Sequence, residues 1–558
     1  MKIPQSVPTK KSFPPAHSRS ALLDIPQEID YNGNKFQPTE KIHFIKKEIT
    51  MNSVKRLFLV LLAAILCSGS IAGCASTEEN ADAGDTTPTA AIEETEAETE
   101  EIDPFADFDY NGQSFRVYTS AHNASATLVS SNFLIEGPEE LTGEAAGDAA
   151  LERNAAVSEM LNISLEFTQV NFGYDGVQND VRTYIMAGTD SYDLIVNDLY
   201  GLTGLTVEGM FYSADKGEYF DFTQPYWYGD FMKDIAFKEG DTFMMAGDFI
   251  IDTLRTGHCL VYNKNLYTDL YGNGDELYET VLNGEWTMDK MTTLVEGAYL
   301  DIDGNGQKNI GDMLGFAVFQ DWGPCIPFLI TNGAQYVTRG EDGYPVIAMN
   351  NERTILMCDK IYDLWNNQGT GALSLWNNDQ NAIMNQFAAG NILIVGYQQL
   401  GSLESDALRS SEYEIGIIPY PKLDELQESY ITSAHDTSEI GLIPVTMPET
   451  NISFVSACLE VLSRESHRNV LPLYYENSLK VKYTRDNQSA QMIDLIHDGL
   501  ANSFALAWHQ PINTFLQNLI HSAAMTKDSF ASKYATTEKA LNKTLERLIE
   551  NYNSNNHG

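Results

Sequence analysis

Short apolar segments that end in polar residues recur along the middle of the chain, separated by stretches with helical character such as 151–161. These segments span residues 115–120, 163–170, 191–198, 311–321, 391–397 and 413–420. Strands that alternate with helices indicate an α/β architecture with sheets of the parallel type. Ligands of such sheets bind outside the carboxyl ends of the strands. We therefore expect binding residues directly after these segments.

The length and charge of the chain narrow the class of protein. With 558 residues it can form two or more domains, and 43% hydrophobic residues are ordinary for a soluble protein. The formal net charge is −43. Nucleic-acid phosphates and anionic membrane surfaces both require clustered Lys and Arg. We therefore exclude nucleic acid as a partner, as well as direct adsorption to a membrane.

Residues 51–73 have the order of features found in a secretion signal. Lys55 and Arg56 precede an apolar run of about ten residues, too short to span a bilayer. Ile71-Ala72-Gly73-Cys74 then resembles the bacterial lipobox, in which the cysteine is diacylated. We expect Met51 to be the true start and residues 1–50 to be a misassigned upstream extension. The mature protein would begin at Cys74, anchored only by lipid to the extracellular face of the cytoplasmic membrane.

Residues 74–107 are predicted to form a flexible tether. The segment is acidic and rich in Thr and Ala, so it cannot bury enough apolar surface to fold. Residues 108–558 would form the folded body. The body contains Cys259, Cys325, Cys358 and Cys458, which are widely spaced and lack CxxC metal-binding spacing. We expect them to be buried small apolar residues.

Several motifs of the body resemble the carbohydrate-type family 1 solute-binding proteins of bacterial ABC importers. They occur in the same order as in that family, from about residue 110 to residue 500. The motifs are an ERN-type helix leading into a strand (142–167), AGTDSYDLIV (187–196), DTFMMAGD followed by LVYNKNLY (241–267), NGEWTMDKMTTL (283–294), NQFAAGNILIVGY (385–397) and YEIGIIPYPK (413–422).

The resemblance implies a type II periplasmic-binding-protein-like fold with two discontinuous α/β lobes joined by a hinge. Lobe 1 would span about 108–256 and 415–490, and lobe 2 about 257–414 and 491–558. It implies a monomer without enzymatic activity that captures a carbohydrate, an oligosaccharide above all, and delivers it to ABC permease subunits. Closure around the ligand would be a hinge motion.

Two other functions stay open at this stage. A surface glycan-binding protein used for sensing or adhesion would have the same fold and cleft. A surface glycoside-acting enzyme would need a carboxylate pair across the sugar, but the chain has too many acidic residues for one pair to stand out. The HExxH, GxSxG, Walker and GxGxxG motifs are absent from the sequence.

Candidate ligand residues follow from the chemistry of sugars, which stack on aromatic rings and hydrogen-bond through their hydroxyls. Three of the candidates have an alternative to ligand binding: Trp322 could cap the core, Trp227 could pack locally, and His435 could have a structural role. Gly396 would allow close backbone approach beside Tyr397. The candidates are Asn197, Asp198, Tyr200, Trp227, Trp322, Tyr397, His435 and Trp508.

Residues 301–312, DIDGNGQKNIGD, resemble an EF-hand calcium loop. The predicted ligands are Asp301, Asp303, Asn305, Gln307 and Asp312. Position twelve is Asp rather than Glu and the sequence offers no second loop, so a calcium sensor is disfavoured. A structural Ca²⁺ is one interpretation, and a metal-free turn stabilised by its own Asx side chains is the other. No catalytic cofactor is expected.

Overall fold

The structure of the chain is a computed structural model that describes residues 103–120, 135–172, 174–318, 325–375, 380–404, 408, 411–475, 487–501, 503–526 and 529–556. The predicted signal peptide, Cys74 and most of the predicted tether lie outside these residues. None of the helices within the described ranges combines the length and hydrophobicity needed to cross a membrane.

The first lobe is built on a five-stranded sheet of order β2-β1-β3-β13-β4. Its strands are β1 (Gln113–Ser120), β2 (Ile163–Val170), β3 (Leu194–Asp198), β4 (Phe211–Tyr212) and β13 (Glu439–Pro444). The first three strands are parallel, and β13 runs antiparallel to β3 and β4. The accompanying helices are α3 (Ala145–Leu161), α4 (Tyr174–Met186), α5 (Leu199–Val207), η1 (Ala214–Lys216), α6 (Gly229–Ile235), α7 (Asp252–Arg255), η4 (Glu449–Asn451), α15 (Ile452–Asn469) and α16 (Leu471–Leu473).

The second lobe is built on a sheet of order β11-β5-β10-β6-β9. Its strands are β5 (His258–Asn263), β6 (Leu314–Val318), β9 (Ala372–Ser374), β10 (Ile392–Gln399) and β11 (Ile415–Ile418). β10, β6 and β9 are parallel, whereas β5 is antiparallel to β10 and β11. The accompanying elements are α8 (Lys264–Tyr271), α9 (Glu276–Leu282), α10 (Met288–Ala298), α11 (Ile326–Thr331), the hairpin β7 (Val337–Arg339) and β8 (Pro345–Ile347), α12 (Glu352–Asn366), η2 (Gln368–Thr370), α13 (Gln380–Ala388), η3 (Leu400–Glu404) and α17 (Asn487–Asp498).

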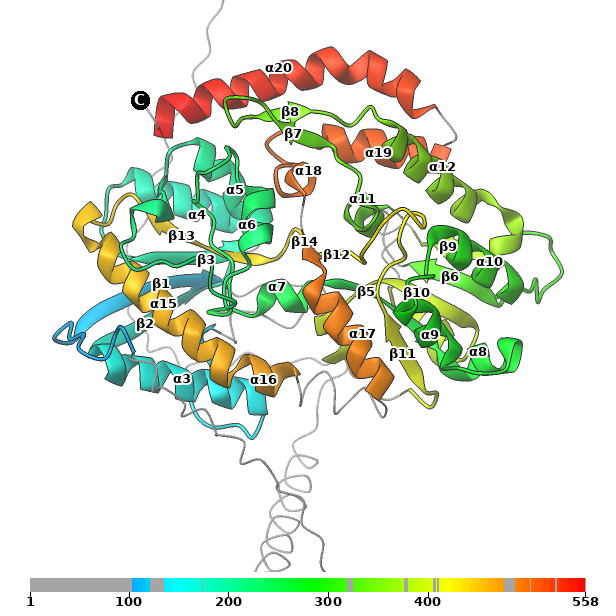
Figure 1. The fold of residues 1–558 in the computed structure, drawn as a ribbon, viewed down its shortest axis with the longest axis horizontal. Coiled ribbons are helices and arrows are strands. Elements are labelled where there is room, and N and C mark those ends of the chain that lie inside the picture. Colours follow the sequence, from blue (N-terminus) through cyan, green and yellow to red (C-terminus); the bar gives the residue numbers. More distant parts are fainter. Residues whose placement is uncertain are drawn as a thin grey trace, which may run out of the picture. The chain divides into compact units, whose positions relative to one another are not determined.

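Three chain segments meet side by side between the two sheets, and we call this region the junction. β12 (Thr432–Ser433) pairs in parallel with β14 (Leu500–Ala501), and Gly257 bridges Ala434. Figure 1 shows β12 and β14 between the lobes. The chain passes from the first sheet to the second before β5 and returns before β13, so the first lobe is assembled from discontinuous segments.

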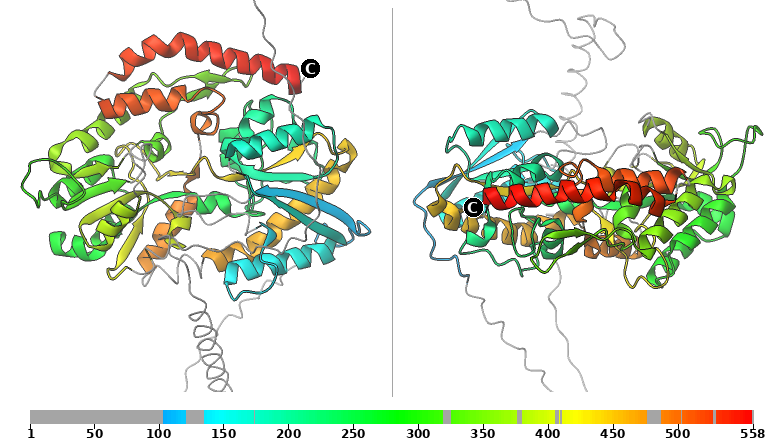
Figure 2. Two further views of the ribbon diagram at one scale, coloured as in Figure 1. Left: turned by 180° about the vertical axis from the view of Figure 1, so that it is seen from behind. Right: turned by 90° about the horizontal axis from the view of Figure 1, so that it is seen from above.

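The C-terminal helix α20 (Phe530–Asn556) contacts helices of both lobes. It packs on α5 of the first lobe and on α12 of the second, beside α19 (Phe515–Thr526), which follows α18 (Phe504–Ala507). Figure 2 shows α20 from behind and from above. Near its end, the buried Tyr552 donates its hydroxyl to Asp241 Oδ2 at 2.8 Å. This end of α20 is thereby attached to the first lobe.

The fold class predicted from the sequence is confirmed: the protein is α/β with two lobes, and each predicted strand is present. Three details differ. The sheets are mixed rather than parallel, and β11 belongs to the second sheet although residue 415 onward was assigned to lobe 1. The predicted tether also ends too late, because Phe105 is buried and Asp103 pairs with Arg464 at 2.6 Å. The four body cysteines are free and buried, as expected.

Candidate functional site

The carboxyl end of β3 holds two of the predicted ligand residues, and both side chains bind within the protein. Asn197 is fully buried and donates its Nδ2 to Oγ of Ser120, the last residue of β1, at 2.5 Å. Asp198 is the N-cap of α5 and accepts the backbone N–H of Gly201 at 2.5 Å. These contacts fix the ends of two neighbouring parallel strands relative to the helix that follows.

Tyr397 lies near the end of β10 in a left-handed backbone conformation, with φ of 58°. This conformation costs a residue with a side chain roughly 1–2 kcal/mol. The Tyr397 N–H donates to the Tyr420 hydroxyl at 2.7 Å. A Cβ on the preceding Gly396 would lie 2.6 Å from the Phe316 ring, so only glycine fits there. The backbone is thus held in a strained shape that fixes the direction of the Tyr397 side chain.

Tyr397 leads into a chain of polar contacts that runs from the second lobe through the junction to the first. Its hydroxyl lies 2.8 Å from His435 Nε2, and His435 Nδ1 lies 2.8 Å from Asp436 Oδ1. Asp436 Oδ2 lies 3.0 Å from His509 Nε2, and the His509 ring contacts the Tyr200 ring at 5.4 Å between centroids. The backbone N–H of Tyr200 also donates to the Asp436 carbonyl at 3.0 Å.

His258, the first residue of β5, is the last member of this set. Its ring stacks on Tyr397 at 5.1 Å, and its Nδ1 faces the Ser433 carbonyl at 2.8 Å. Among the described residues, its buried Nε2 has no hydrogen-bond partner. We call the complete set the junction network: Tyr200, His258, Tyr397, His435, Asp436 and His509.

The charges of the junction network follow from its contacts. Burial, together with nearby His435, lowers the pKa of His258 to about 3, so this ring is neutral at physiological pH. Burial alone would raise the pKa of Asp436, but the attraction of the nearby His435 and His509 rings brings it below its ordinary value. The network therefore contains an ionised carboxylate between two imidazole rings.

Two of the three tryptophans predicted as ligand platforms lie within the described residues, and both are buried. Trp508 is fully buried, donates its indole N–H to the Ile235 carbonyl at 2.7 Å, and stacks on Phe504. Trp227 is 4% exposed and donates to Glu460 Oε2 at 2.9 Å. In this structure both rings pack in the interior. Trp322 lies outside the described residues, so its role stays a prediction.

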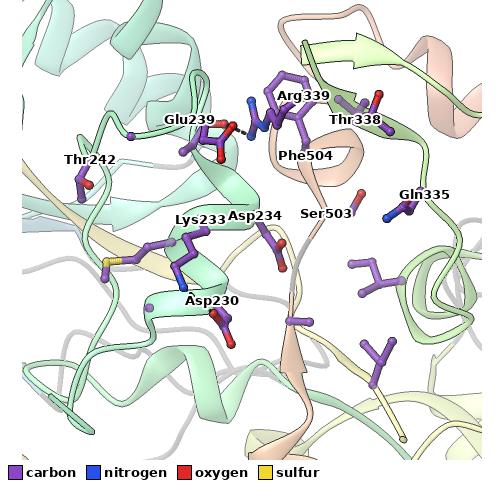
Figure 3. Close-up of a pocket in the computed structure, with 18 of the residues that line it drawn as sticks. Asp230, Lys233, Asp234, Glu239, Thr242, Gln335, Thr338, Arg339, Ser503 and Phe504 are labelled. Carbon is purple, nitrogen blue, oxygen red and sulfur yellow. Dashed lines mark hydrogen bonds and ion pairs between the residues drawn. The ribbon is translucent and has the colours of Figure 1, made fainter. Parts of the chain in front are cut away.

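A cavity of about 1220 Å³ opens between the lobes (Figure 3). It is lined by α6 and the segment after it, by residues 333–339, and by Ser503 and Phe504. Polar side chains from both lobes converge on it, and Trp227 is among the residues that line it. The charged side chains lining it are Asp230, Lys233, Asp234, Glu239, Asp241 and Arg339.

This cavity is separate from the junction network, because none of the network residues is among the described residues that line it. It also lies along the C-terminal half of α11 and the residues beyond, at Leu329, Ile330 and 333–339. The start of α11, by contrast, follows the carboxyl end of β6. Of the two features, the junction network has the position expected of a ligand site in an α/β sheet.

The loop 301–312 brings Asp301, Asp303 and Asp312 together, with one oxygen of each within 4.8 Å of the others. These three carboxylates could hold a metal ion. Asp301 also accepts the N–H groups of Gly304 and Gly306, and Asn305 Oδ1 accepts that of Gln307. The hydrogen bond from Gly306 is the largest cause that lowers the pKa of Asp301. These bonds within the loop would also support a turn without metal.

Three of the six network residues were not predicted from the sequence: His258, Asp436 and His509. Asp436 is next to the predicted His435, and His258 opens a strand just after the chain crosses between lobes, so both had a weak local signal. His509 had none, because its contacts are to residues far away in the sequence. Asn197, Asp198, Tyr200 and Tyr397, which follow strand-like segments of the sequence, lie at or beside the junction, and so does His435, which was singled out as a polar residue.

Comparison with known proteins gives a structural likeness only. No family model matches the chain, and no curated protein matches it either. UspC of M. tuberculosis is similar at 14% identity and a TM-score of 0.50, covering 77% of this chain and 100% of UspC. A cyclo/maltodextrin-binding protein complexed with maltotetraose is similar at 13% identity and a TM-score of 0.49, covering 79% and 97%. The ABC substrate-binding protein Lmo0181 of Listeria monocytogenes, in complex with cycloalternan, is similar at 11% and 0.47, covering 78% and 99%.

At these identities the likeness concerns the fold alone, and of these three structures UspC has the highest TM-score. Its whole length is covered by this chain. The two mixed five-stranded sheets and the interleaved order of their strands agree with the architecture expected from the sequence motifs. The chain has the two-lobe α/β fold of the periplasmic binding proteins.

Proposed function

We propose that this protein is a solute-binding protein that captures a carbohydrate, an oligosaccharide above all, and delivers it to the permease subunits of an ABC importer. The observation that carries the proposal is the junction network, in which polar and aromatic side chains of both lobes and the junction converge. A ligand that bridged the lobes there would favour one relative arrangement of them, which is what a permease can recognise.

The site at the carboxyl edge has the chemistry that sugars require. Tyr200 and Tyr397 supply rings and hydroxyls, and the imidazoles of His258 and His435 supply hydrogen-bonding nitrogens. The sequence adds Trp322, which follows the β6 segment along the chain. We also propose that Cys74 carries the lipid that anchors the protein outside the cell, and that the Asp301 triad holds a structural Ca²⁺.

The decisive experiment is thermal denaturation of the mature protein against a panel of neutral oligosaccharides that differ in sugar and linkage. A ligand that binds the folded state raises Tm by mass action. We expect at least one glycan to do so without being turned over. Turnover would instead support a glycoside-acting enzyme, and a panel without any effect would contradict the carbohydrate assignment.

Matched variants then locate the site. Tyr397→Phe removes only a hydroxyl and should weaken binding by about 1 kcal/mol, and Trp322→Ala should weaken it by about 1–3 kcal/mol. Tyr212→Phe, which removes a hydroxyl in the first lobe away from the network, should leave Kd unchanged. If Gln335→Ala or Asp234→Ala in the cavity weakens binding while Tyr397→Phe does not, the solute binds in the cavity instead.

A further inference from the structure

The contacts around His435 determine which of its nitrogens carries the proton. Nδ1 lies 2.8 Å from Asp436 Oδ1, 3.1 Å from the backbone nitrogen of Thr437 and 3.0 Å from the Thr437 hydroxyl oxygen. The Asp436 carboxylate can only accept a hydrogen bond, whereas the Thr437 N–H can only donate one. Asp436 and the Thr437 N–H therefore require opposite states of Nδ1, and only one of them can be satisfied, whereas the Thr437 hydroxyl can donate or accept.

Asp436 is the stronger partner, because it is ionised and closer. Its contacts with His435 and His509 lower its pKa in spite of burial. A charge-assisted hydrogen bond is roughly twice as strong as a neutral one. In the neutral ring, a proton on Nδ1 leaves Nε2 as an acceptor. The atom that lies 2.8 Å from Nε2 is the Tyr397 hydroxyl, which can donate to it.

We propose that Asp436 is a positioning residue that fixes His435 in the Nδ1–H tautomer, so that Tyr397 donates its hydroxyl to His435 and its oxygen accepts from the hydroxyls of the solute. The part of this inference that concerns the solute rests on the proposed function, whereas the part that concerns the tautomer of His435 does not. It assigns a direction to the hydrogen bonds of the network, so that Tyr397 recognises solute groups that donate a hydrogen bond.

The surroundings of His435 are consistent with this arrangement. His258, which faces it from β5, is neutral and has its own proton directed to the Ser433 carbonyl, so it adds no competing charge. His509, which follows α18, contacts the other oxygen of Asp436. Tyr200 of α5 donates its backbone N–H to the Asp436 carbonyl. The carboxylate is thereby flanked by His435 and His509 while its backbone is held by the first lobe, which fixes its place as a positioning group requires.

The first test measures the tautomer in protein without ligand, by nitrogen-15 NMR of histidine-labelled protein at pH 8. The resonances of His435 are assigned by their loss in His435→Gln. We expect a protonated Nδ1 and an unprotonated Nε2 in the wild type. In Asp436→Ala the Thr437 N–H is left as the backbone partner of Nδ1, so the two nitrogens should exchange states. Asp436→Asn retains an acceptor oxygen and should keep the wild-type pattern.

An unprotonated Nδ1 in the wild type would overturn the proposal, whether or not any glycan binds. A pattern that is unchanged in Asp436→Ala would overturn it too. Asp248→Asn serves as the matched control, because Asp248 pairs with His467 Nδ1 at 2.6 Å in another part of the first lobe. It should leave the His435 resonances as they are.

The second test uses the glycan found by the thermal panel. We expect Asp436→Ala to raise its Kd roughly tenfold, as the loss of one hydrogen bond can do, and Asp436→Asn to restore it to within about threefold of the wild type. In a Tyr397→Phe background, Asp436→Ala should add almost nothing, because the two residues act through one hydroxyl. Additive effects would mean that Asp436 acts on the site independently of Tyr397.

Discussion

At the scale of single residues, the sequence predicts which strand ends carry polar groups but not which groups touch. Tyr397 and His435 were found because one ends an apolar run and the other stands out in a polar segment. Their contact, and the link through Asp436 to His509, joins segments separated by 38 or more residues. Such pairings depend on where the lobes place each segment, which periodicity does not encode.

Trp508 illustrates how burial decides a role. Its ring is fully enclosed and its N–H is bonded to the Ile235 carbonyl. We expect Trp508→Ala to lower the free energy of unfolding by about 3–5 kcal/mol, because it creates a large cavity and leaves a carbonyl unpaired. Urea denaturation measures this. If the free energy of unfolding falls by less than about 1 kcal/mol and glycan binding weakens, Trp508 would instead be a ligand-binding residue.

The pair of His467 and Asp248 makes stability depend on pH. The hydrogen bond to Asp248 raises the pKa of His467 above its unfolded value of about 6.5, although burial opposes the shift. The pair therefore stabilises the protein below about pH 6.5, and this contribution is lost as the pH rises through the raised pKa. We expect the unfolding free energy of the wild type to fall over this range relative to that of Asp248→Asn.

The comparison must use the slope with pH rather than the absolute stability. Tyr228 also donates its hydroxyl to Asp248, at 2.7 Å, so the substitution has a cost that does not depend on pH. His467→Gln should flatten the slope in the same way. A wild-type slope equal to those of both variants would show that the pair is not linked to folding.

At the scale of elements, the strands were easier to predict from the sequence than the neighbouring strands with which they pair. Each predicted segment contains a strand, because a short buried run, as in β3 and β6, or an alternating pattern, as in β2, fits few other structures. β11 was placed in the wrong lobe, since nothing in IGII distinguishes one sheet from the other. The loop 301–312 was predicted from the spacing of its oxygens. Spacing is sufficient to bring its carboxylates together because their hydrogen bonds are made within or beside the loop, although Lys308 also reaches the Trp365 carbonyl.

The proposed Ca²⁺ in this loop has a direct test. After treatment with a chelator, added Ca²⁺ should raise the Tm of the wild type but not that of Asp301→Ala, because the ion would bind the folded loop alone. Asp342→Ala is the matched control: Asp342 accepts the N–H of Tyr344 within the β7–β8 hairpin and should keep the response. If added Ca²⁺ does not change the Tm of the wild type, the loop is a metal-free turn.

At the scale of the whole molecule, the two-lobe architecture could be predicted because motif order carries it. The attachment of α20 to both lobes could not, since its contacts depend on the assembled surface of α5 and α12. The start of the folded body was misplaced for a related reason. Phe105 is one apolar residue in an acidic segment, and its burial depends on Phe108 and Tyr219, which pack around it.

The lipid anchor is also a property of the whole molecule. Cells that express the chain from Met51 and are labelled with a fatty-acid probe should incorporate the label into the wild type but not into Cys74→Ala. Without the lipid, the protein should be released to the medium. Equal labelling of both proteins would contradict anchoring at Cys74, and Cys67→Ala, which alters only the predicted signal segment, should be labelled normally.

The interleaving of the two sheets has a consequence for how such a protein can change over time. All strands of the second sheet lie in the sequence between β4 and β13, which are neighbours in the first sheet. A single recombination point in that interval would build the first sheet from strands of two genes, with β13 paired to strands that it did not evolve with. Lobes can therefore be exchanged between related genes only as an insert with two boundaries, both of which fall at the junction. New ligand preferences are then more readily reached by substitutions at the strand ends than by replacing a lobe.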